Sequence, residues 1–234
     1  MAAGYLILDR SGSMSGLERD TIGGFNGMIE KQKKERDRVN VTTVLFDDQT
    51  DVIHDRFPID LVEPLTDQDY FVRGTTALLD AVGGSIQKTD QVVKHLPEGH
   101  KPGKVIFVII TDGQENASVK YRYADVRRMI GAKKECGWEF LFLGANIDAA
   151  EEAEKIGIAR NRSVTYENDA EGIALNYEVV ARTVGRAVKS QQTADFVAEG
   201  WAEEIAEYRR RKNRKNGETK RRNGLWQIGR GLRK

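Results

Sequence analysis

The chain has 234 residues, of which 39% are hydrophobic and 31% are charged. These proportions are typical of a soluble globular protein and exclude an intrinsically disordered chain. No apolar run approaches the roughly 18–20 residues of a membrane span, so we expect no membrane partner. The first residues lack a basic region ahead of an apolar stretch, so we expect no signal peptide. The single cysteine, Cys136, excludes a disulfide framework within the chain and suits a reducing compartment.

The net charge of +1 conceals an uneven distribution of charged residues. Residues 208–234 contain 12 Lys or Arg and one acidic residue, Glu218, which leaves 25 of the 37 basic and 35 of the 36 acidic residues for the rest of the chain. Such a segment is typical of a solvated arm that meets something acidic. We therefore expect a flexible basic tail over residues 209–234. It either binds nucleic acid, docks on an acidic protein surface (the chain's own included), or only keeps the chain in solution.

Short apolar segments rich in β-branched residues predict strands along the chain. They lie at residues 4–9, 39–46, 51–57, 105–111 and 138–144, with a weaker one at 163–166. Apolar residues spaced three or four apart predict helices between and after them. These helices lie around Ile22 and Phe25 and at residues 76–95, 123–134, 148–156, 172–189 and 194–208.

The order of these elements predicts an α/β fold. The strands at 39–46 and 51–57 are joined only by residues 47–50, which are too few for a crossover and indicate an antiparallel hairpin. The other strands alternate with helices, which indicates right-handed crossovers. We therefore expect a doubly wound, mostly parallel central sheet with helices on both faces and one antiparallel strand at its edge.

We divide the chain into three parts. Residues 1–160 contain the predicted sheet and its helices and form the main domain. Residues 161–208 are expected to form a helical extension that packs on this domain, and residues 209–234 form the basic tail.

Oxygen-bearing side chains follow two of the predicted strands. Asp9 ends the first strand and is followed at alternate positions by Ser11 and Ser13, while Asp112 follows the strand at 105–111. In a doubly wound sheet, ligands bind beyond the carboxyl ends of the strands where the winding reverses. If these two strands are neighbours across that point, the four side chains share one crevice.

A threonine at the start of the helix at 76–95 reaches the same edge of the sheet. Oxygen-only ligands suit a hard cation such as Mg²⁺, which wants octahedral geometry and is commonly held by one or two carboxylates. Two facing carboxylates without a cation would repel each other, and a metal removes that repulsion. Each motif alone is more typical of a turn or a helix cap than of a metal site, so the hypothesis of a metal site depends on their combination.

Three motifs resemble the metal-ion-dependent adhesion site of von Willebrand factor A domains. Residues 9–13 resemble the Asp-x-Ser-x-Ser motif, residues 74–80 the element whose threonine precedes a helix, and residues 111–113 the element that supplies a second aspartate. The resemblance covers roughly residues 4–160. It implies the α/β fold described above and a ligand set of Asp9, Ser11, Ser13, Thr76 and Asp112.

The same resemblance implies how such a site works. The metal is Mg²⁺, with Mn²⁺ or Ca²⁺ as alternatives, and a partner protein supplies an Asp or Glu to its last coordination position. The site alone does not make a member of the family an enzyme. Residues 23–26, 76–81 and 143–149 are similar to compact members from bacteria and bacteriophages. From this similarity we expect the chain in the cytoplasm of a bacterial host cell or in a virion.

Other polar residues near this edge have simpler interpretations. Asn146 and Asp148 follow the strand at 138–144, where a helix cap is a more common role than metal binding. Asp80 lies one helical turn after the threonine and is expected to stabilise the start of its helix. Glu115 and Asn116 are either neighbours of the metal ligands or residues of a solvated loop.

The sequence contains no signature of an enzyme. It lacks a phosphate-binding Gly-x4-Gly-Lys-Ser/Thr loop, a dinucleotide-binding Gly-x-Gly-x-x-Gly and a Gly-x-Ser-x-Gly nucleophile elbow. Our leading hypothesis is a non-enzymatic, Mg²⁺-dependent protein-binding module. The alternative is a virion-assembly or nucleic-acid-binding component that uses residues 209–234, with a structural metal site.

Overall fold

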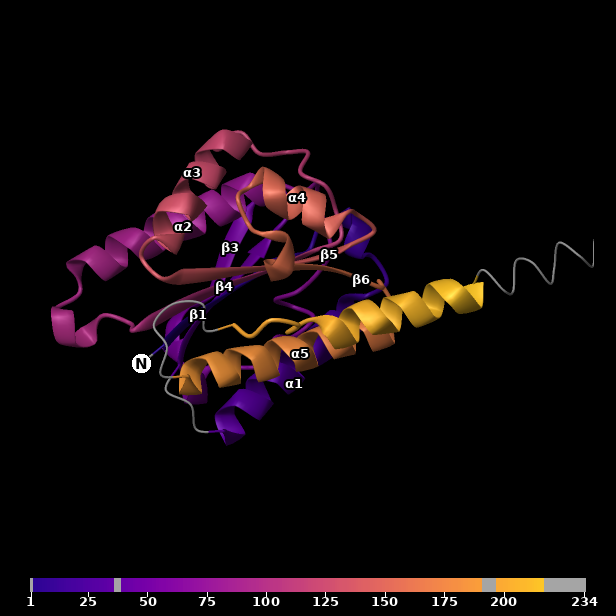
Figure 1. The fold of residues 1–234 in the computed structure, drawn as a ribbon, viewed down its shortest axis with the longest axis horizontal. Coiled ribbons are helices and arrows are strands. Elements are labelled where there is room, and N and C mark those ends of the chain that lie inside the picture. Colours follow the sequence, from indigo (N-terminus) through magenta and orange to yellow (C-terminus); the bar gives the residue numbers. More distant parts are fainter. Residues whose placement is uncertain (1, 36–38, 191–196, 217–234) are drawn as a thin grey trace, which may run out of the picture.

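The computed structural model describes residues 2–35, 39–190 and 197–216, and it contains a six-stranded sheet between two layers of helices (Figure 1). The strand order is β3-β2-β1-β4-β5-β6. The strands are β1 (Ala2–Asp9), β2 (Val39–Phe46), β3 (Thr50–Pro58), β4 (Lys104–Thr111), β5 (Trp138–Ala145) and β6 (Ser163–Tyr166). Only β3 is antiparallel, and it lies at one edge beside β2. The expected doubly wound sheet with one antiparallel edge strand is confirmed.

Helices cover both faces of the sheet, as the sequence predicts. Figure 1 shows α1 (Glu18–Lys34) and α5 (Ala170–Lys189) below the sheet, and α2 (Leu78–His95), α3 (Tyr123–Lys134) and α4 (Ala149–Lys155) above it. Short 3-10 turns at Gly12–Met14, Ile59–Leu61, Glu98–His100 and Arg160–Arg162 join these elements.

Alternating side chains of the central strands point to opposite faces of the sheet and belong to two separate hydrophobic cores. In β1, Leu6 and Leu8 pack toward α1 and α5, whereas Tyr5 and Ile7 pack toward α2, α3 and α4. Tyr5 stacks on Phe107 of β4 with ring centroids 4.5 Å apart. A strand buried on both faces needs apolar residues at nearly every position, which explains the uninterrupted apolar runs of β1 and β4.

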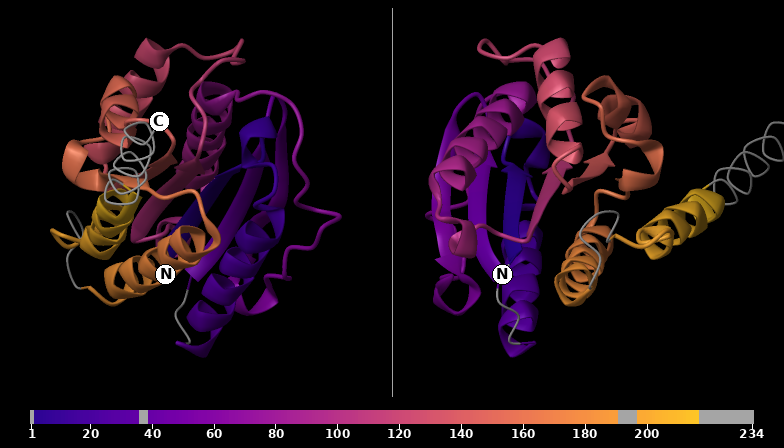
Figure 2. Two further views of the ribbon diagram at one scale, coloured as in Figure 1. Left: turned by 90° about the vertical axis from the view of Figure 1, so that its right-hand side faces the viewer. Right: turned by 60° about the vertical axis from the view of Figure 1, so that its left-hand side comes forward.

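The last described helix differs from the sequence prediction. A helix was expected at 194–208 and a flexible tail from 209, but the helix spans residues 203–216, so residues 209–216 are helical (Figure 2). Its polar contacts explain the difference, because Tyr208 donates to Asp169 and Lys212 forms an ion pair with the same carboxylate at 2.8 Å. Residues 194–196 and 217–234 of these predicted segments lie outside the described residues.

In the described ranges, no helix is both long and apolar enough to cross a membrane.

A cluster of charges around the buried Arg10 and Asp47 holds the loop after β1 against the loop before α2. The guanidinium groups of Arg10 and Arg73 both donate to one oxygen of the fully buried Asp47, at 2.9 and 2.6 Å. Both also ion-pair with Asp51 and lie 5.3 Å from the ring centre of Phe71. The backbone NH of Arg73 donates to the carbonyl of Arg10 at 3.0 Å, so the cluster fixes the path of the loop that carries Ser11 and Ser13.

Replacing Arg10 by Met should destabilise the protein strongly, because the buried Asp47 would lose its buried cationic partner and keep only the partly exposed Arg73. Breaking a buried ion pair costs about 3 kcal/mol or more, and urea unfolding measures this loss. The matched control is Arg160→Met, which removes an exposed pair with Glu154 and should leave the unfolding midpoint unchanged. Equal midpoints for the two variants would contradict the assigned role of the charge cluster.

Candidate metal centre

The carboxyl ends of β1 and β4 lie side by side and bring the first predicted ligands together. The two strands pair in parallel, with Leu8 opposite Ile110. Next along, the hydroxyl of Thr111 donates to one oxygen of Asp9 at 2.5 Å, and the backbone NH of Ser11 donates to the other at 2.7 Å. Both oxygens of the Asp9 carboxylate are therefore held in place from two different elements.

A chain of hydroxyl groups connects the remaining predicted ligands. The Thr76 hydroxyl donates to the Ser11 hydroxyl at 3.0 Å, the two serine hydroxyls lie 3.1 Å apart, and Ser13 donates to Asp112 at 2.5 Å. Ser13 is exposed, whereas the other four side chains are buried. The structure thus gathers all five predicted residues into one cluster that opens to solvent at Ser13.

Glycine at position 113 keeps space free between these oxygens. A Cβ atom at Gly113 would lie 2.9 Å from the Thr76 hydroxyl and 3.4 Å from the Ser13 hydroxyl. Cβ atoms rarely approach neighbours this closely, so a larger residue would displace the hydroxyl groups. The space that a Cβ would fill is bordered by oxygen donors, which fits a small cation.

The electrostatics of the two carboxylates also fit a cation. Asp9 and Asp112 are only 2% and 3% exposed, and burial raises the pKa of each. The negative charge of Asp112 raises the pKa of Asp9 further. Across the described part of the chain, no three His, Cys, Asp or Glu side chains gather as a metal-binding group. The hydroxyls are therefore needed to complete a donor set here, and Mg²⁺ accepts such mixed oxygen ligands.

Asn168 belongs to this site although the sequence analysis did not find it. Its side-chain NH₂ donates to Asp112 at 3.0 Å from the loop between β6 and α5. Its side-chain oxygen is buried and has no hydrogen-bond partner among the described residues. An unsatisfied buried oxygen on the residue that holds the Asp112 carboxylate is a second observation that fits a site built to hold a further group.

Two residues that the sequence left open, Glu115 and Asn116, position Thr76. The Asn116 side chain accepts from the backbone NH of Thr76 at 2.9 Å, and its own backbone NH donates to the Thr76 carbonyl at 3.0 Å. Glu115 accepts from the backbone NH of Leu79 at 2.8 Å in the first turn of α2. The loop after β4 therefore caps α2 and places Thr76 beside Asp112.

The other acids of this edge have structural roles. Asp148 caps α4 by accepting from the backbone NH groups of Ala150 and Glu151 at 3.1 Å each, which confirms the helix-cap interpretation. Asp80 accepts from three successive backbone NH groups in the loop that leads to α3, those of Val119, Lys120 and Tyr121. It thereby ties the start of α2 to that loop.

Comparison with solved structures gives the class of fold. The vWF domain of the type V pili tip protein Mfa5 from Porphyromonas gingivalis matches with a TM-score of 0.59 and 10% identity, over 83% of this chain and 98% of that one. A von Willebrand factor type A protein from Catenulispora acidiphila matches at 0.55 and 15% identity, over 79% of this chain and 42% of that one.

A third match is proximal thread matrix protein 1 from the mussel byssus, at a TM-score of 0.53 and 14% identity. It covers 79% of this chain and 46% of that one, and the mussel protein is also known with zinc in its MIDAS motif. This chain therefore spans about half the length of the mussel protein and of the Catenulispora acidiphila protein. No family model and no curated protein matches the sequence. The chain has the fold of von Willebrand factor A domains, which confirms the resemblance seen in its motifs at the level of the fold.

Replacing Gly113 by Ala should weaken Mg²⁺ binding at least about tenfold, because the new Cβ would push the Thr76 hydroxyl away. Isothermal titration calorimetry with MgCl₂ measures this change. Gly131→Ala is the matched control, since a Cβ there meets nothing within 4 Å and should leave Mg²⁺ binding unaltered. Equal affinities for wild type and Gly113→Ala would contradict the assigned position of the metal.

Asp112→Asn should raise the thermal stability of the metal-free protein at pH 7. Because burial raises the pKa of Asp112, its ionised form is unfavourable in the folded state, and stability is lost as the pH rises from about 3.9 through the raised value. The substituted amide oxygen still accepts from Ser13, and the new NH₂ group can donate to the unpaired oxygen of Asn168 once that amide turns over. Thermal unfolding in EDTA should show the gain at pH 7 and its disappearance below about pH 3.9. A variant that melts below wild type at pH 7 would contradict this account.

Proposed function

We propose that this chain is a non-enzymatic protein-binding module that captures an acidic residue of a partner in a Mg²⁺-dependent manner. Asp9, Ser11, Ser13, Thr76 and Asp112 would hold the metal. When bound, Mg²⁺ supplies an open coordination position that suits a carboxylate. The exposure of Ser13 beside buried carboxylates carries this proposal, because it combines a charged interior with an opening toward a partner.

The protein's own residues prepare this site before any partner arrives. Thr111 and the backbone of Ser11 hold Asp9, while Asn168 holds Asp112. Preorganised ligands lose little conformational freedom on binding, which strengthens affinity. Two carboxylates match the charge of one divalent cation and leave the hydroxyls as neutral donors. No side chain of this set has to act as a general base, in agreement with a binding role.

The basic C-terminal segment bears on the alternative function, in which residues 209–234 bind nucleic acid or act in virion assembly. In the described portion, Arg209 lies 3.9 Å from Glu167 and Lys212 lies 2.8 Å from Asp169, so the segment docks on the chain's own acidic surface. Nucleic-acid binding and a role in virion assembly would use the other basic residues of 209–234, of which residues 217–234 lie outside the described residues. A bacteriophage-type origin and a cytoplasmic or virion location remain proposals of the same kind.

Asp9→Ala and Asp112→Ala should abolish Mg²⁺ binding in calorimetry, since each removes a carboxylate ligand. Asp148→Ala is the matched control, because this acid lies at the same edge of the sheet but caps α4. The control should bind Mg²⁺ as the wild type does. Binding retained in both alanine variants would overturn the ligand set.

Partner capture should then depend on the metal. Immobilised full-length chain should retain its partner in MgCl₂, release it in EDTA, and fail to retain it as the Asp112→Ala variant. A chain ending at residue 208 separates the alternative, in which residues 209–234 bind nucleic acid. Capture that persists in EDTA, falls steeply with salt and vanishes in the shortened chain would instead favour nucleic-acid binding through the tail.

A further inference from the structure

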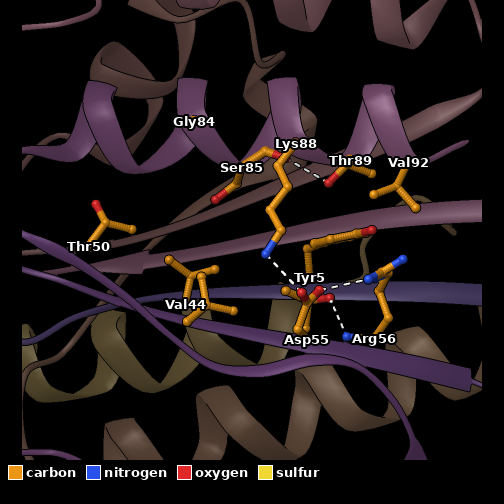
Figure 3. Close-up of a pocket in the computed structure, with 12 residues that line it drawn as sticks. Tyr5, Val44, Thr50, Asp55, Arg56, Gly84, Ser85, Lys88, Thr89 and Val92 are labelled. Atoms are coloured by element: carbon orange, nitrogen blue, oxygen red, sulfur yellow. Dashed lines mark hydrogen bonds and ion pairs between the residues drawn. The ribbon is translucent and has the colours of Figure 1, made fainter. Parts of the chain in front are cut away.

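A second pocket lies far along α2 from the metal centre. It has a volume of about 190 Å³ and lies between α2 and the strands β1, β2 and β3 (Figure 3). Its walls are mostly apolar and include Tyr5, Val44, Val52 and Val92. The volume equals that of about six water molecules at ~30 Å³ each, which admits a small molecule and excludes a folded segment.

Three charged side chains stand together on the same pocket. Lys88 of α2 reaches toward β3 and lies 2.9 Å from Asp55, and Arg56 donates to the other oxygen of Asp55 at 3.0 Å (Figure 3). All three side chains are 37–49% exposed, so they lie where the pocket meets solvent. Two cations share one anion, which leaves the mouth of an apolar pocket with an excess positive charge.

The backbone of β3 departs from regular strand geometry to make this arrangement. Arg56 has a φ of 57°, in the left-handed region where residues other than glycine are strained. Its backbone NH donates to the hydroxyl of Thr42 at 3.1 Å, which stabilises the distortion. Consecutive residues of a regular strand point to opposite faces, yet Asp55 and Arg56 both line the pocket. The strain therefore places an arginine at the mouth.

Gly84 provides the opening on the side of α2. It lines the pocket, and a Cβ atom at this position would meet nothing within 4 Å. Its neighbour Gly83 is different, because a Cβ there would lie 2.7 Å from the ring of Tyr121. Close packing explains the glycine at 83, whereas the glycine at 84 leaves space.

We propose that this pocket binds a small amphipathic carboxylate, with its hydrocarbon part against Tyr5 and the valines and its carboxylate at Arg56 and Lys88. The apolar walls suit a short acyl or aryl group, and the excess positive charge at the mouth suits one negative charge. This site is independent of the metal centre and of the function proposed for it.

Octanoate is the probe, and methyl NMR of the full-length chain is the measurement. Titration should shift the methyl signals of Val44, Val52 and Val92 in a saturable manner. Affinity should fall about fourfold for each methylene removed in the series from octanoate to butanoate. 1-Octanol should bind at least about fivefold more weakly than octanoate because it lacks the charge. Equal binding of octanol would overturn the assignment to carboxylates.

Variants locate the site. Gly84→Leu fills the opening and should weaken octanoate binding at least about tenfold. Gly27→Leu, on α1 and equally free of neighbours within 4 Å, should leave binding unchanged. Arg56→Gly removes the cation while relieving the backbone strain, so the protein should stay folded and bind octanoate about fivefold more weakly. Absent methyl shifts, or unaltered affinity in both Gly84→Leu and Arg56→Gly, would overturn the proposal.

Discussion

The parallel pairing of β1 with β4 is the constraint on which the rest of the site depends. These strands are separated by most of the main domain in sequence, but their pairing places the end of β1 beside the end of β4. Asp9 then accepts from Thr111, and Asp112 follows one residue later. Two carboxylates are buried side by side as a consequence, with pKa values raised by that burial. A fold that keeps such a pair benefits from a cation between them.

The loops around this pair hold one another in place. The charge cluster centred on Asp47 fixes the first loop against the segment before α2, and the loop after β4 caps α2 through Glu115. Each ligand is therefore positioned by an element other than its own. These contacts between loops explain how the Thr76 hydroxyl comes within 3.0 Å of the Ser11 hydroxyl, which in turn lies 3.1 Å from that of Ser13.

Helix α2 connects two features of different chemistry. Thr76, which lies just before its first turn, belongs to the metal centre, while its middle, at Gly84 and Lys88, covers the apolar pocket. The edge strand β3 also contributes to two features. Its Asp51 belongs to the charge cluster that holds the metal-site loop, and its Asp55 and Arg56 line the pocket. The antiparallel hairpin that the sequence predicts thus closes one edge of the sheet and also forms part of the pocket, because the backbone distortion at Arg56 places two charged side chains at the pocket mouth.

Local patterns in the sequence determined the strands, most helices, the strand hairpin and the five oxygen-bearing side chains. These features follow from periodicity, from connection length and from residue types at the ends of strands, all of which act over a few neighbouring residues. Tertiary structure alone decided the partners of Asp112 and Asp47, because Asn168 and Arg73 reach them across 56 and 26 positions. It also decided that residues 209–216 are helical, since Lys212 gains its stabilising contact from Asp169. Such contacts leave no local pattern, because they form only when the sheet and its loops have already brought the chain together.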